Sequence, residues 1–94
     1  MDNLIKAIRN LHGCNASYSE SVDVKELFEG KTAWEGTVHL FNVDHPDTDT
    51  CYAWSSPIEG SSKRKYYAVL KIPPVDSPEA AVRASIVSDY KGQS

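Results

Sequence analysis

The chain has 94 residues, of which 40% are hydrophobic and 24% are charged, and its formal net charge is −3. This length and balance predict one globular domain over residues 1–94, with enough apolar surface for a single thin core. The acidic balance argues against a protein that works mainly by neutralising phosphates. No apolar run approaches the ~18 residues of a membrane span.

The N-terminal segment MDNLIKAIRN lacks the order of charged and apolar residues that is typical of a signal peptide. We therefore predict a cytoplasmic protein. In a reducing compartment, the two cysteines, Cys14 and Cys51, are expected to be free thiols.

Residues 2–12 are predicted to form an amphipathic helix. Asp2 or Asn3 can cap its start, and Gly13 can end it in the left-handed conformation. Its apolar residues have the i, i+1, i+4, i+7 spacing of one stripe, and they are Leu4, Ile5, Ile8 and Leu11.

Residues 18–43 are predicted to form a β-hairpin that turns at Gly30, where a positive φ is easily adopted. The second arm alternates clearly, and one of its faces carries Trp34, Gly36, Val38 and Leu40. The first arm is ambiguous, because residues 21–29 also have the pattern of a capped helix. Its β-branched valines favour the strand.

Residues 44–50 are predicted to form a polar loop, because they contain Pro46 and three aspartates. A second hairpin follows, with arms over residues 51–56 and 64–72 that are rich in aromatic and β-branched side chains. In the later arm, alternation places on a predicted core face Tyr66, Ala68, Leu70 and Ile72. The other face is predicted to be exposed to solvent, and it carries Lys65, Tyr67, Val69 and Lys71.

A last helix is predicted to begin at Ser77, the N-cap, with Pro78 as its first helical residue. The predicted fold is therefore α+β. It is a four-stranded antiparallel meander, or a three-stranded one if residues 21–29 are helical. The N-terminal helix and the C-terminal helix are both expected on one face of the sheet.

With both helices on one face, the other face of the meander would keep an apolar surface. The residues of this candidate interface are Phe41, Cys51, Ala53, Tyr67 and Val69. Uncovered apolar sheet faces and edges usually find a partner, and aromatic residues are typical interface anchors. The leading hypothesis is a small, soluble, non-catalytic binding domain that forms a homodimer through its sheet or binds a protein partner.

The alternative hypothesis is nucleic-acid binding through Lys63, Arg64 and Lys65, which lie beside two tyrosines that could stack on bases. The order helix, sheet, helix is similar in layout to double-stranded RNA-binding domains. Those domains carry a lysine cluster at the start of the last helix, where this chain has Ser77-Pro78-Glu79. A protein partner is therefore favoured over a nucleic acid.

A small hydrolase or thiol enzyme would have to use His12, Cys14 or His45, but these residues show no catalytic or ligand spacing and lack a group that orients a base. The aspartates of residues 44–50 do not fit the ligand positions of an EF-hand loop. The sequence therefore predicts no enzyme activity, no metal site and no cofactor.

Overall fold

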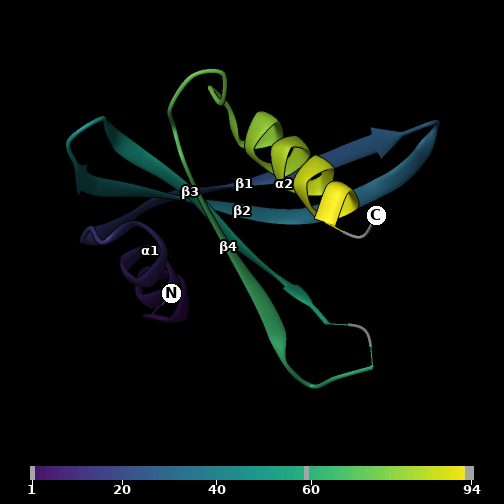
Figure 1. Ribbon diagram of the computed structural model, residues 1–94, viewed down its shortest axis with the longest axis horizontal. Coiled ribbons are helices and arrows are strands. Elements are labelled where there is room, and N and C mark those ends of the chain that lie inside the picture. The colour runs from purple at the N-terminus through teal and green to yellow at the C-terminus, as the bar shows by residue number, and fades with distance from the viewer. Residues whose placement is uncertain (1, 59, 93–94) are drawn as a thin grey trace.

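The computed structural model describes residues 2–58 and 60–92, which form two helices and one antiparallel sheet. The strand order is β1-β2-β3-β4, so each strand pairs with its neighbour in sequence (Figure 1). The predicted α+β class and four-stranded meander are confirmed, and residues 21–28 belong to a strand. In chain order the elements are α1 (Asp2–His12), β1 (Ala16–Phe28), β2 (Lys31–His45), β3 (Thr48–Pro57), β4 (Arg64–Leu70) and α2 (Pro78–Gly92).

Both hairpin turns in the first half of the sheet are tight. Between β1 and β2, Glu29 and Gly30 have positive φ angles of 54° and 78°, which is the combination found in type I′ turns. Only residues 46–47 separate β2 from β3, so the predicted loop over residues 44–50 is wrong. Asp44 is accommodated at the end of β2 because its carboxylate accepts bonds from the Asn15 backbone N–H at 2.7 Å and side-chain amide at 3.0 Å.

The helix ends follow the predicted capping signals. Gly13 has a φ of 69°, and its N–H donates to the carbonyl oxygen of Arg9 at 2.8 Å. Ser77 is the N-cap of α2, since its Oγ accepts a bond from the Ala80 N–H at 3.1 Å. Within residues 2–58 and 60–92, neither helix has the length and apolar character needed to cross a bilayer.

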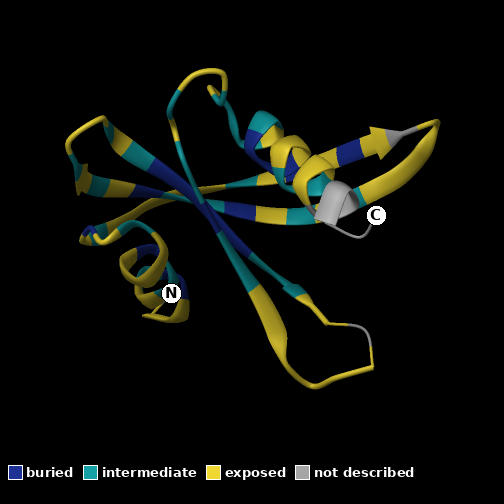
Figure 2. Ribbon diagram, viewed as in Figure 1, coloured by how far each residue is buried: buried dark blue, intermediate teal, exposed yellow. Residues whose placement is uncertain are grey.

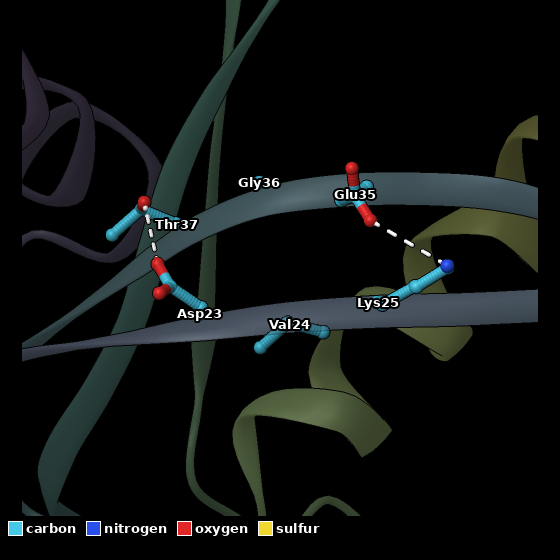
Figure 3. Close-up of a pocket in the computed structure, with 6 residues that line it drawn as sticks. All are labelled: Asp23, Val24, Lys25, Glu35, Gly36 and Thr37. Atoms are coloured by element: carbon cyan, nitrogen blue, oxygen red, sulfur yellow. Dashed lines mark hydrogen bonds and ion pairs between the residues drawn. The ribbon is translucent and has the colours of Figure 1, made fainter.

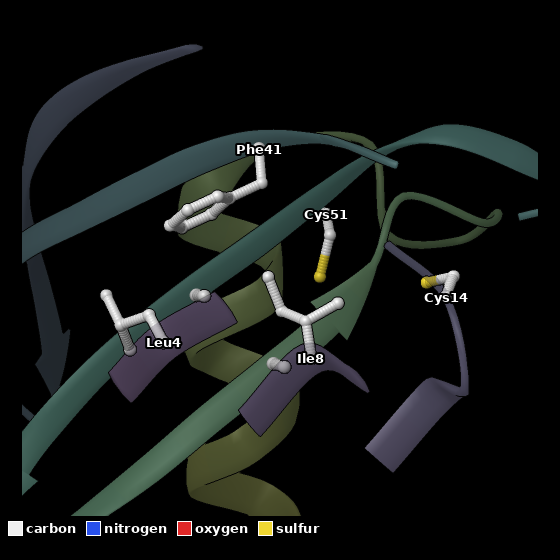
Figure 4. Packing of buried hydrophobic residues seen from close by; sticks show 7 residues of the cluster. Leu4, Ile8, Cys14, Phe41 and Cys51 are labelled. Atoms are coloured by element: carbon white, nitrogen blue, oxygen red, sulfur yellow. The ribbon is translucent and has the colours of Figure 1, made fainter. Parts of the chain in front are cut away.

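Helix α1 packs on one face of the sheet. Its buried residues Leu4 and Ile8 contact a cluster whose other buried members are Cys14, Phe41, Cys51, Ala53 and Ala68. In Figure 4, α1 lies in front of the strands and α2 lies behind them. On β3 the members Cys51 and Ala53 are alternate residues, and on β4 the half-buried Tyr66 and Leu70 pack beside Ala68 at alternate positions, as expected for side chains on a single face.

Helix α2 packs on the opposite face. Its buried residues Ala81 and Val82 contact the intervening strand positions, which are Val24, Val38, Tyr52 and Trp54. The helix is also bonded to β1, because Arg83 Nη2 donates to Glu26 Oε1 at 3.1 Å. Glu26 is the one charged residue among the buried positions of the described chain, and this ion pair accounts for its burial.

The central strand β3 is therefore buried on both of its faces. Cys51, Tyr52, Ala53 and Trp54 are consecutive buried residues (Figure 2), and their side chains alternate between the α1 cluster and the α2 cluster. The prediction that both helices lie on one face is therefore corrected: α1 packs on one face of β3 and α2 packs on the other. Tyr67 and Val69, predicted to face solvent, are half-buried in the α2 cluster, because the β3–β4 register places them opposite Trp54 and Tyr52.

The two hairpins of the sheet diverge at one end. β2 pairs with β1 as far as its first residue, Lys31, but it pairs with β3 only from His39, opposite Ala53, onward. β3 and β4 remain paired out to Pro57 and Arg64. The β1–β2 and β3–β4 hairpins thus form the arms of a fork that opens beyond His39 and Ala53 (Figure 1).

Gly36 leaves space for the indole of Trp34, two residues earlier on the same face of β2. A Cβ atom at residue 36 would lie 2.9 Å from Cη2 and from Cζ2 of that ring. The indole also contacts Trp54 edge-on, with ring centroids 6.1 Å apart, and its Nε1 donates to Ser56 Oγ at 3.0 Å. Gly36 is therefore required for the position of Trp34 across the fork.

We expect Gly36→Ala to lower the free energy of unfolding by about 1–3 kcal/mol, because the new methyl group must displace the Trp34 ring. Urea denaturation followed by circular dichroism measures this loss, and tryptophan fluorescence reports the ring displacement. Ala33→Ser, at an exposed position of the same strand, is the matched control and should change stability by less than about 0.5 kcal/mol. Equal stability of the two variants would contradict the packing role of Gly36.

Candidate functional site

The residues predicted as an interface do not lie on one exposed face. Phe41, Cys51 and Ala53 are 0% exposed, in the cluster beneath α1. Tyr67 and Val69 lie on the other side of the sheet, in the cluster beneath α2. The prediction of an uncovered apolar face is therefore wrong, because each helix covers one face of the sheet.

The predicted basic run is divided between the two faces of the sheet. Arg64 and Lys65 begin β4, and successive strand residues point in opposite directions. Arg64 donates from Nε to Ser55 Oγ at 2.9 Å and from Nη2 to the Ser55 carbonyl oxygen at 3.2 Å. Lys65 Nζ lies 5.1 Å from the centroid of the Tyr67 ring, a cation–π contact. Lys63 precedes the strand and is exposed, so the three cations do not form one patch.

His12, Cys14 and His45 are bound to different parts of the chain. His12 Nε2 donates to the Ala68 carbonyl oxygen at 2.7 Å, which fixes the end of α1 to β4. His45 Nδ1 accepts the N–H of Asp47 at 3.1 Å in the β2–β3 turn. Among the described residues, no group of three or more His, Cys, Asp or Glu is placed to hold a metal ion.

Both cysteines are buried free thiols of the α1 cluster (Figure 4). Burial raises the pKa of Cys14 and raises the pKa of Cys51 to about 12, because an apolar environment disfavours the charged thiolate. A nucleophilic cysteine requires a lowered pKa. The surroundings of both thiols are therefore those of packing residues.

The fork between the hairpins contains a hollow of about 290 Å³. The Trp34–Ser56 hydrogen bond joins the two arms across it. The polar side chains of the lining come from three strands, and they include Glu35, Thr37, His39, Ser55 and Arg64. Because β2 and β3 stop pairing at His39 and Ala53, strand edges as well as side chains border this hollow.

A second hollow, of about 390 Å³, lies over the β1–β2 hairpin (Figure 3). Two cross-strand contacts form its rim: Thr37 Oγ1 donates to Asp23 Oδ1 at 3.1 Å, and Lys25 Nζ lies 3.8 Å from Glu35 Oε2. Both hollows are on the face that α1 covers farther along, since Glu35 and Thr37 alternate in phase with Phe41. We call this uncovered polar surface the open face, and its residues are Ser21, Asp23, Lys25, Glu35, Thr37, His39, Ser55 and Arg64.

His39 links the fork to β1. Its Nδ1 lies 2.7 Å from Ser21 Oγ, which in turn lies 2.6 Å from the Tyr18 hydroxyl oxygen. Burial lowers the pKa of His39, since partial desolvation disfavours the imidazolium, so the ring is neutral near pH 7. With Nδ1 used by Ser21, the ring nitrogen left for a ligand is Nε2.

The pairing of Ser21 with His39 is the feature that the sequence did not reveal. The two residues are opposite each other in the β1–β2 register, and that register would have identified them. A hydroxyl beside an imidazole can form a nucleophile–base pair. Here the Ser21 hydroxyl is also bonded to Tyr18, and the contacts orient the imidazole ring.

Comparison with known proteins does not assign a family to this geometry. No family model, curated protein or solved structure matches the chain. Function is therefore inferred from the residues of the open face and their contacts.

The buried Cys51 thiol is expected to make the protein less stable as the pH rises above about 9. An unfolded chain ionises this thiol near its ordinary pKa of 9.0, whereas the folded chain keeps the proton up to about 12. The folded state then binds more protons than the unfolded state, so the free energy of unfolding falls by up to about 1.4 kcal/mol per pH unit over this range. Urea denaturation at a series of alkaline pH values measures the slope.

Cys51→Ala provides the control for this pH dependence. The variant is less stable at neutral pH because it leaves a cavity under α1, but its stability should decline less steeply above about pH 9, since the thiol is gone. Identical slopes for the two proteins would show that Cys51 does not keep its proton in the folded state.

Proposed function

We propose that this protein is a small, non-catalytic binding domain whose ligand-binding site is the fork on the open face. The observation that supports this proposal is that the hollow carries opposite charges on its two arms. Arg64 is held by two hydrogen bonds to Ser55, and Glu35 has a weak, exposed ion pair with Lys25. Polar groups that neighbouring residues hold in place, at a concave surface, are typical of ligand sites.

Binding is favoured over catalysis because of what surrounds the reactive side chains. The thiols are buried, with raised pKa values, and Ser21 is engaged by both Tyr18 and His39. The polar groups of the fork are hydrogen-bond donors and acceptors. A cytoplasmic location, which we also propose, fits two cysteines that are free.

Small polar molecules that bind the protein are expected to change the backbone amide NMR signals of residues 35–39, 55–57 and 64. A screen of a fragment library against the labelled protein tests this expectation. Arg64→Gln should weaken the binding of negatively charged fragments, because it removes the positively charged group that lines the hollow. Lys63→Gln is the matched control, since it removes the same charge from the exposed loop and should leave binding intact. Fragments that bind only elsewhere, or negatively charged fragments that bind equally to both variants, would refute the fork as the site.

A second candidate function is self-association along β1. This strand has 13 residues and lies at the edge of the sheet, where unpaired backbone groups can pair with another strand. Tyr18 and Leu27, near its two ends, are 47% and 59% exposed. Charged residues and the irregular register between Tyr18 and Glu20 oppose such pairing, so this candidate is weaker than the fork.

Self-association predicts a dimer at micromolar concentrations, measured by size-exclusion chromatography with light scattering. Replacing both exposed apolar residues, as Tyr18→Ser and Leu27→Lys, should convert the dimer into a monomer because it removes the apolar contacts and adds like charges to the edge. Leu27→Lys alone, which leaves the contacts of Tyr18, Ser21 and His39 in place, should leave fragment binding at the fork intact. A monomeric unmodified protein would exclude this candidate.

Nucleic-acid binding through Lys63, Arg64 and Lys65 has less support. Arg64 and Lys65 point to opposite faces, and each is engaged by a neighbour, Ser55 or the Tyr67 ring. A phosphate backbone contacts several cations at once on one surface. The open face also carries Asp23 and Glu35, which repel a polyanion.

A further inference from the structure

We propose that the fork binds a small zwitterion, with the ligand's carboxylate on Arg64 and its ammonium group on Glu35. This inference rests on the proposed function of the fork and names the chemical class of its ligand. Arg64 lines the hollow from the β3–β4 arm and Glu35 lines it from the β1–β2 arm. In the described chain these two residues are paired with their own neighbours and not with each other.

The Arg64 guanidinium is prepared for a carboxylate. Its Nε and Nη2 atoms donate to Ser55, at 2.9 Å to Oγ and 3.2 Å to the carbonyl oxygen. These bonds fix the plane of the guanidinium at the hollow and leave Nη1 outside them. A guanidinium held in one orientation loses less conformational freedom when it binds a planar carboxylate than a flexible cation does.

The Glu35 carboxylate can exchange its present partner for an ammonium group. Its Oε2 lies 3.8 Å from Lys25 Nζ, and the two side chains are 65% and 58% exposed (Figure 3). An exposed ion pair of this length is weak. A ligand ammonium group can therefore bind the carboxylate oxygens from the side of the fork, while Lys25 remains on the side of the second hollow.

The neutral groups of the hollow disfavour a simple anion. Thr37 already donates its hydroxyl hydrogen to Asp23, and the Trp34 N–H is used by Ser56. Arg64 is the one cation among the described residues that line the hollow, and Glu35 would repel an anion bound beside it. A ligand that carries both charges turns this repulsion into attraction, which is how opposite charges at one site produce specificity. The volume of about 290 Å³ suits a small ligand.

The test is a titration of the full chain with a series of linear ω-amino acids from glycine to 6-aminohexanoate, followed by amide NMR. We expect millimolar binding at residues 35–39, 55–57 and 64, with one chain length bound most tightly because the two charged side chains come from different arms of the fork. Propionate and propylamine, which carry one charge each, should bind at least about fivefold more weakly than that best zwitterion.

Two pairs of variants assign the two charges. Arg64→Gln and Glu35→Gln should each weaken binding of the best zwitterion by at least about fivefold, whereas Glu35→Gln should not weaken propionate. Lys63→Gln and Glu20→Gln change equivalent charges at exposed positions outside the hollow and should have no effect.

Three outcomes would overturn the proposal: propionate as tight as every zwitterion, an undiminished affinity in Glu35→Gln, or no binding of the series at the fork. If other fragments still bind at the fork in any of these cases, the zwitterion is wrong and the proposed function stands. If neither the zwitterions nor the fragments bind there, both fail.

Discussion

The fold of this protein depends on burying β3 from both sides. Cys51, Tyr52, Ala53 and Trp54 are consecutive, apolar and buried, and the strand points them alternately to opposite faces. Antiparallel sheets often leave one face exposed to water, but β3 carries apolar side chains on both faces, and both must be buried. Each face therefore needs a helix of its own, and α1 and α2 supply one layer each. A chain of this length thus divides its apolar surface into two thin clusters on the two sides of one strand.

Two short helices cannot cover both faces of the sheet completely. The part of the sheet that they leave exposed is where a ligand-binding site can form. Helix α1 covers its face near Phe41 and Ala68, and beyond that contact the same face becomes the polar open face. On this face the hairpins separate where the α1 cluster ends, because its members on β2 and β3 do not extend past Phe41 and Ala53. The fork is thus a consequence of where the core ends. Arg64 is held at the fork by Ser55, and the fork shares with the packing of the fold the residues Trp34 and Gly36, which also line the hollow.

The candidate site was less accessible to sequence reasoning than the fold. The basic run can be identified in the sequence. Because β4 begins at Arg64, however, Arg64 and Lys65 are adjacent strand residues and point to opposite faces of the sheet. The partners Ser21 and His39, or Arg64 and Ser55, are far apart in sequence and become neighbours through the register of two hairpins. Register depends on turn length and on which side chains pack together. Alternation divides the residues of one strand between two faces, but it does not show which residues of the next strand share each face. For this reason Tyr67 and Val69 were predicted to share a face with Cys51 and Ala53, whereas they lie beside Trp54 and Tyr52.

The sequence by itself determined the elements: the caps at Gly13 and Ser77, the turn at Gly30, the aromatic strands and their antiparallel order. These follow from local chemistry, in which each signal lies within a few residues of the structure that it produces. Only the tertiary structure decided that the helices take opposite faces, that Phe41 and Cys51 are core residues, and that the hairpins part to form a fork. Those features depend on which distant side chains exclude water together, and burial is a property of the assembled chain and not of any one segment.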